Sequence, residues 1–149
     1  MAVILANRTT AVVLIDANVV LRFLLADDDR QSAEAEDLLT RAPEGSLHLS
    51  ALTVAEVTWV LTAHFETPRD LVARAIQRVL ALPSIRTDDT LLDAVARFSA
   101  TTLDFADCAL AAEAAAKGKI AVSFDKDLRR FSDISAMPPK AALERLLMR

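Results

Sequence analysis

The fold of this chain is decided near its beginning, by the stretch Val12-Val13-Leu14-Ile15-Asp16-Ala17-Asn18. Its first four residues are apolar and mostly β-branched, which predicts a strand buried on both faces. Asp16 follows at the point where this strand leaves the sheet, and open α/β sheets bind ligands beyond the carboxyl ends of their strands. The stretch Ile120-Ala121-Val122-Ser123-Phe124-Asp125 repeats the arrangement, so two strands are each expected to bring an aspartate to one acidic pocket.

Composition predicts one globular domain over residues 1–149. The 149 residues are 53% hydrophobic and include only two glycines and five prolines, which is typical of a chain with a large core and short loops. No apolar run approaches the roughly 18 uncharged residues of a membrane span, and no basic region precedes the short apolar segment at the start, so neither a span nor a signal peptide is expected. The single cysteine, Cys108, excludes an internal disulfide and a cysteine-rich metal site, and it fits a cytoplasmic location.

The net charge limits how this chain could contact nucleic acid. With 17 basic and 21 acidic residues, the formal charge is −4, which excludes binding through a strongly basic surface overall. Any contact with nucleic acid must therefore use a local basic patch, or metal ions that bridge to phosphate.

Hydrophobic periodicity predicts strands that alternate with helices, which is typical of a parallel α/β sheet with right-handed connections. The expected strands cover residues 12–16, 47–50, 84–87 and 120–124. The expected helices cover residues 18–25, 30–41, 52–61, 69–82, 90–100, 103–117 and 140–149, with a short charged turn or helix over 126–131.

Four carboxylates stand in apolar surroundings: Asp16, Glu56, Asp107 and Asp125. An unpaired charge in such surroundings is costly, and a divalent cation would compensate several of them together. Mg²⁺ and Mn²⁺ prefer such oxygen ligands. The remaining reactive side chains, His48, His64 and Cys108, are expected to be ordinary surface, strand or core residues.

Each of the four acids also has a purely structural interpretation, which the sequence leaves open. Asp16 fits the N-cap of the next helix, and Thr53-x-x-Glu56 fits a capping box. Asp104 fits the N-cap of its helix, with Asp107 in the first turn, where the helix dipole favours an acid. Asp125 fits the start of a turn with Lys126 and Asp127.

Four segments together resemble the motifs of the PIN domain, and most closely those of the ribonuclease toxins of the VapC-like type. In chain order they are Leu14-Ile15-Asp16-Ala17-Asn18-Val19-Val20-Leu21-Arg22-Phe23-Leu24-Leu25, Leu49-Ser50-Ala51-Leu52-Thr53-Val54-Ala55-Glu56-Val57, Leu103-Asp104-Phe105-Ala106-Asp107-Cys108-Ala109-Leu110-Ala111-Ala112 and Val122-Ser123-Phe124-Asp125-Lys126-Asp127-Leu128. The resemblance implies an α/β/α sandwich with a central, mainly parallel sheet and a core over about residues 12–139. A short N-terminal extension and a C-terminal helix flank that core.

The resemblance also implies a site and a function. It makes Asp16, Glu56, Asp107 and Asp125 the catalytic residues, which hold Mg²⁺ or Mn²⁺. Asp104 or Asp127 would assist them, and Asn18 and Ser123 would be supporting polar groups. The implied activity is metal-dependent hydrolysis of RNA phosphodiester bonds by the toxin of a toxin–antitoxin pair. The implied partners are the RNA substrate, a cognate antitoxin that covers the active site, and further copies of the chain in a homodimer or higher homo-oligomer.

The basic residues that would contact substrate phosphates are Arg22, Arg86, Lys126, Arg129 and Arg130. Arg22 is the best candidate because it closely follows Asp16, and the sequence leaves open that all five are solvated surface charges or ion-pair partners. Trp59, on the predicted helix of Glu56, fits either the core or a binding surface.

Two other functions remain open at this point. One is a PIN-like module that binds another protein without turnover, which the absence of metal-dependent cleavage would reveal. The other is a phosphatase of a different α/β family. A haloacid-dehalogenase-type phosphatase would place a second aspartate two residues after Asp16, where this chain has Asn18.

Overall fold

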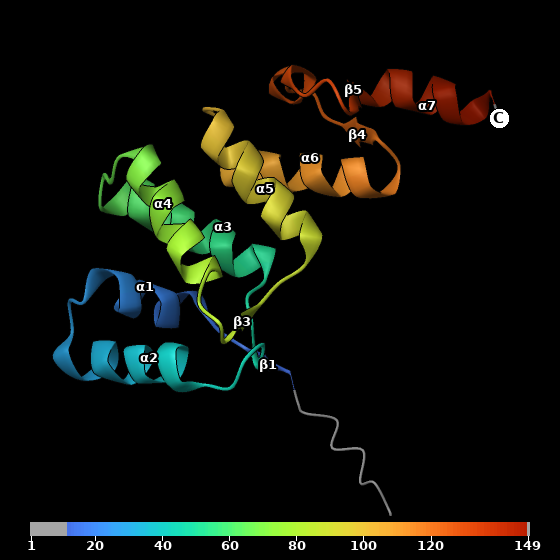
Figure 1. Cartoon of the computed structure of the whole chain (residues 1–149). Helices are drawn as coiled ribbons and strands as arrows, with labels where there is room; N and C mark the ends of the chain where they lie inside the picture. Colours follow the sequence, from blue (N-terminus) through green and yellow to red (C-terminus); the bar gives the residue numbers. More distant parts are fainter. Residues whose placement is uncertain (1–11, 149) are drawn as a thin grey trace, which may run out of the picture.

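The computed structural model describes residues 12–148 and confirms an α/β fold with parallel strands (Figure 1). The expected N-terminal extension lies outside this part of the chain. In chain order the elements are β1 Val13–Leu14, α1 Ala17–Leu25, α2 Asp29–Arg41, β2 Leu47–His48, α3 Ala51–Trp59, the π-helical turn η1 Val60–His64, α4 Arg69–Leu80, β3 Ile85–Arg86, α5 Asp89–Ala100, α6 Phe105–Lys117, β4 Ile120–Val122, the 3₁₀ turn η2 Asp127–Arg130, β5 Ser135–Met137 and α7 Pro139–Leu147.

The parallel strands divide between two sheets. One has the order β1-β2-β3, with Val13 opposite Leu47, and the other pairs β4 with β5, with Ile120 opposite Ser135. In Figure 1, β4, β5 and α7 lie together on the far side of α6 from β1. Strand β5 was not expected from the sequence, because Ser135-Ala136-Met137 is short and contains no β-branched residue.

The prediction that the first and last strands are buried on both faces is wrong. Val13 and Leu14 of β1 are 47% and 68% exposed, and Val122 of β4 is 48% exposed. Within residues 12–148, each of these strands lies at the edge of its sheet and pairs with a neighbour on one side. The buried residues are instead Ile15, directly after β1, and Ala121 within β4.

Two hydrophobic clusters fill the interior. The larger one is built from Ile15, β2 and helices α1 to α6, and includes Leu49, Val57 and Ile76. The smaller one lies beside β4 and β5 and comprises Ala111, Ala114, Ala121, Leu128 and Ile134. Helix α6 contributes to both, because Cys108 and Ala112 belong to the larger cluster. The expectation that Cys108 is a core residue is confirmed, since its side chain is fully buried.

No helix between residues 12 and 148 is both long enough and apolar enough to span a bilayer.

Candidate active site

The electrostatic centre of the candidate site is Asp107, in the first turn of α6. Its side chain is half-buried, and burial raises the pKa of its carboxyl group. The negative charges of Asp104, Asp125 and Asp127 raise that pKa further. The structure thus brings four of the predicted acids into one region, where α6 begins and the chain leaves β4. Such a concentration of negative charge favours the binding of a cation.

A tight turn after β4 holds Asp125 and Asp127. Ser123 Oγ accepts a hydrogen bond from the Asp125 N–H at 2.9 Å, and Asp125 Oδ1 accepts one from the Asp127 N–H at 3.0 Å. The structural interpretation of Asp125, that it starts a turn, is therefore confirmed. One carboxylate oxygen forms this turn, which fixes the direction of the other.

Asp16 and Asp104 occupy N-cap positions, as their structural interpretation predicted, but their carboxylates do not cap. Asp16 precedes α1 and Asp104 precedes α6, and within the described residues neither side chain makes a capping hydrogen bond. The Asp16 carboxylate instead accepts a hydrogen bond from Asn18 Nδ2 at 3.5 Å. Both carboxylates are exposed and remain available to a ligand.

The capping-box interpretation of Glu56 is wrong. Helix α3 begins three residues earlier than that motif requires, because Ser50 is the N-cap and its Oγ accepts the Thr53 N–H at 3.2 Å. Glu56 therefore lies in the second turn, where its exposed carboxylate cannot reach the free N–H groups of the helix start.

A hydrogen bond of Thr53 connects α3, which carries Glu56, to the end of β1, which Asp16 follows. Its buried hydroxyl donates a hydrogen bond to the Ile15 carbonyl at 3.1 Å. Ile15 directly precedes Asp16, and Glu56 is three residues after Thr53, so this bond fixes the two acid-bearing elements relative to each other.

The acids thus form two groups. Asp16 follows β1 and Glu56 lies on α3, which Thr53 bonds to the end of that strand, whereas Asp107 lies on α6 and Asp125 follows β4. Among the residues described, the charges that act on Asp107 do not include Asp16 or Glu56. Between residues 12 and 148, no three His, Cys, Asp or Glu side chains are grouped closely enough to hold a metal ion. The donor chemistry, which is all carboxylate oxygen, does fit Mg²⁺ or Mn²⁺.

Comparison with known families decides what this arrangement belongs to. Residues 13–134 match the model of the PIN domain family. The chain belongs to the PIN domain family. Proteins of this family are typically metal-dependent nucleases, and carboxylates are the side chains that commonly bind Mg²⁺ or Mn²⁺. A search of curated proteins gave no match.

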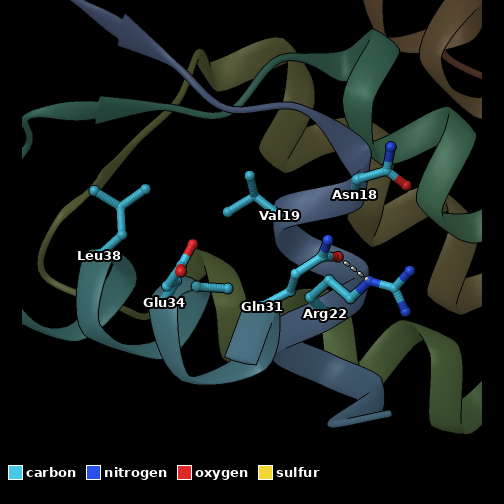
Figure 2. A pocket seen from close by; sticks show the side chains of 7 residues that line it. Asn18, Val19, Arg22, Gln31, Glu34 and Leu38 are labelled. Atoms are coloured by element: carbon cyan, nitrogen blue, oxygen red, sulfur yellow. Dashed lines mark hydrogen bonds between the residues drawn. The ribbon is translucent and has the colours of Figure 1, made fainter. Parts of the chain in front are cut away.

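Arg22 of this PIN domain is engaged in an ion pair. Its Nη1 lies 2.7 Å from Asp27 Oδ1, and its Nε donates to Gln31 Oε1 at 2.9 Å. Figure 2 shows Arg22 of α1 bonded to Gln31 of α2, and both residues line a cavity of about 390 Å³ between the two helices. The ion-pair interpretation of Arg22 is therefore confirmed.

A second cavity of the PIN domain was missed by sequence reasoning. It has a volume of about 440 Å³ and lies between α3, the turn η1 and the start of α6. Trp59 lines it and is 66% exposed, so the core interpretation of this residue is wrong. The available signal was the position of Trp59 three residues after Glu56, which places both on one side of the helix.

Proposed function

We propose that this PIN domain is a Mg²⁺- or Mn²⁺-dependent endoribonuclease, and that it acts in the cytoplasm as the toxin of a toxin–antitoxin pair. The observation that carries the proposal is Asp107, a half-buried acid whose pKa is raised by burial and by the negative charges of Asp104, Asp125 and Asp127. Acids that repel one another in this way are stabilised by a bound cation, and membership of the PIN family supports a nuclease.

In this proposal Asp16, Glu56, Asp107 and Asp125 hold the ion, and Asp104 or Asp127 assists. When bound, such an ion lowers the pKa of a coordinated water and stabilises negative charge on the phosphate under attack. Neighbouring polar groups position the carboxylates that would bind the ion. The Asn18 amide orients the Asp16 carboxylate, and the Ser123 hydroxyl holds the backbone of Asp125.

The toxin role rests on the resemblance of the four motifs to VapC-like toxins. An antitoxin and a second copy of the chain are the partners that this role requires. The alternative is a PIN domain that binds a protein without turnover. The match to the PIN family argues against a phosphatase of another α/β family.

The first test is a thermal-shift titration with Mn²⁺ on the wild type and on Asp107→Asn. A ligand that binds only the folded state stabilises it by about 2.7 kcal/mol at 100 times its Kd. We expect the melting temperature of the wild type to rise with Mn²⁺ and that of Asp107→Asn to rise much less. Asp37→Asn is the matched control, because Asp37 is an exposed acid on α2 whose ion pair is with Arg41, and it should behave like the wild type.

The second test measures cleavage of a fluorescently labelled single-stranded RNA in Mn²⁺. We expect Asp107→Asn to lose at least about 100-fold in rate while its circular dichroism spectrum is unchanged, because loss of a metal ligand removes the ion's electrostatic contribution. Undiminished cleavage by a pure Asp107→Asn preparation would overturn the assignment of the site.

For the toxin role, induced expression of the wild type should arrest bacterial growth, whereas expression of Asp107→Asn should not. Metal binding without cleavage would favour the protein-binding alternative.

A further inference from the structure

The cavity beside Trp59 has the size and position of a substrate pocket. Its volume of about 440 Å³ lies within the range of roughly 300–1,000 Å³ that is usual for pockets holding small ligands. One wall is α3, where Trp59 is one helical turn from Glu56. The opposite wall is the start of α6, where Asp104 lines the cavity one turn from Asp107. Lining residues of the cavity therefore lie one helical turn from an acid of each group, Glu56 on α3 and Asp107 on α6.

The charged residues of the lining favour an uncharged occupant. Within the described part of the chain, the lining contains one cation, Arg69, and one anion, Asp104. Arg69 is already engaged, because its guanidinium donates to the Phe98 and Leu103 carbonyls and stacks 3.7 Å above the centre of the Phe98 ring. The charges of Arg69 and Asp104 oppose each other, so the lining offers neither an anion nor a cation a net attraction, and an uncharged group loses nothing there.

The uncharged lining residues suit a flat group that carries hydrogen-bond donors. Trp59 presents a largely exposed indole, on which an aromatic ring can stack. The Thr58 and Thr62 hydroxyls donate to the Ala55 and Thr58 carbonyls, at 2.9 Å and 2.7 Å, so their oxygens keep free lone pairs. Those oxygens can accept hydrogen bonds from the exocyclic amino group of a base.

We propose that this cavity binds one nucleobase of a single-stranded RNA, stacked on the Trp59 indole next to the phosphate that the carboxylates engage. The inference rests on the proposed ribonuclease function and deepens it, since it names the part of the RNA that this cavity holds. A base inside a duplex is stacked between its neighbours and cannot enter such a pocket.

Trp59 supplies its own test, because it is the single tryptophan of the sequence and all tryptophan fluorescence comes from it. The wild type is titrated in EDTA, which prevents cleavage, with a short single-stranded oligoribonucleotide and with an abasic oligomer of the same length and charge. We expect saturable quenching by the first and none by the second. Fluorescence anisotropy of labelled RNA then gives the affinities of variants.

A stacking contact contributes enough binding energy per base for Trp59→Ala to weaken RNA binding about 10-fold. Trp59→Phe retains an aromatic ring and should stay within about threefold of the wild type. Phe65→Ala is the matched control, because Phe65 is an exposed aromatic residue that follows η1 and does not line the cavity, and it should bind like the wild type.

Equal quenching by both oligomers would overturn the proposal, as would unchanged binding by Trp59→Ala. A shift of the Trp59 emission with protein concentration, without RNA, would overturn it in favour of a second copy of the chain as the occupant. If the wild type cleaves RNA and Trp59→Ala does so with an unchanged KM, the base pocket is ruled out and the ribonuclease function stands. If quenching depends on the base but no metal-dependent cleavage is found, the nuclease function is ruled out and the base pocket stands.

Discussion

At the scale of single residues, the positions of the acids could be predicted but their hydrogen bonds could not. The sequence placed Asp16 and Asp104 at helix starts, where the structure has them. It could not decide whether their carboxylates cap, because that depends on side-chain rotamers and on which residue begins each helix. The capping box at Glu56 failed for this reason, since Ser50 begins α3.

Asp107→Asn should raise the stability of the metal-free protein at neutral pH. Because burial and neighbouring acids raise the pKa of the Asp107 carboxyl, the folded state holds this proton more tightly than the unfolded state. Its contribution to stability is therefore greatest at low pH. That contribution falls as the pH rises from the ordinary aspartate pKa near 4 to the raised value. Urea unfolding between pH 3 and pH 8 should show the variant gaining over the wild type as pH rises. An equal pH dependence for both would contradict the assigned pKa shift.

Thr53→Val should destabilise the protein by about 1–3 kcal/mol. The substitution preserves shape but removes the donor to the buried Ile15 carbonyl, and an unsatisfied buried acceptor costs about this much. Urea unfolding measures the loss. Thr40→Val is the control, because the Thr40 hydroxyl bonds the Glu36 carbonyl on the exposed surface of α2, and it should change stability by less than about 0.5 kcal/mol. Equal effects of the two substitutions would mean that Thr53 does not connect α3 to the end of β1.

At the scale of elements, helices were more predictable than strands. Every expected helix is present, because each has nine or more residues, which is long enough for its apolar residues to recur with the helical period. The strands are two or three residues long, too short for any periodicity to form, and β5 was missed altogether. The π-helical turn η1 was also missed, since its i to i+5 hydrogen bond from the Phe65 N–H to the Val60 carbonyl has no sequence signature.

Asp133→Asn should weaken the attachment of β5 to α5. Arg97 of α5 bonds both Asp133 oxygens, at 2.9 Å and 2.5 Å, and its guanidinium lies over the Phe131 ring. We expect a loss of about 1 kcal/mol, near the upper end for partly exposed ion pairs. Arg97 lowers the pKa of the Asp133 carboxyl, so this contribution is present above about pH 4 and is lost as the pH falls through the lowered value.

Urea unfolding measures the loss, and Asp70→Asn is the control. This substitution breaks the exposed Asp70–Arg74 pair of α4 and should cost less than about 0.5 kcal/mol. A loss no greater than that of the control would rule out this attachment.

At the scale of the whole molecule, the family and the fold class could be predicted, and the division of the strands could not. The four motifs pointed to the PIN domain, which the family match over residues 13–134 confirms. The alternation of strands and helices predicts parallel pairing but does not state which strands are neighbours. One sheet was therefore expected, whereas β4 pairs with β5 and β1 pairs with β2 in two separate sheets.

The two separate hydrophobic clusters have a kinetic consequence. A segment that is packed on its own small core can open without the rest of the protein, and its amide hydrogens then exchange with solvent sooner. We expect the β4–β5 amides to exchange faster than those of α3, as measured by mass spectrometry in D₂O. Mn²⁺ should slow exchange in β4 and β5 selectively if an ion joins Asp125 to Asp16. The bound ion would then hold the β4–β5 part of the chain to the end of β1. The four proposed catalytic acids would be brought together only while the ion is bound.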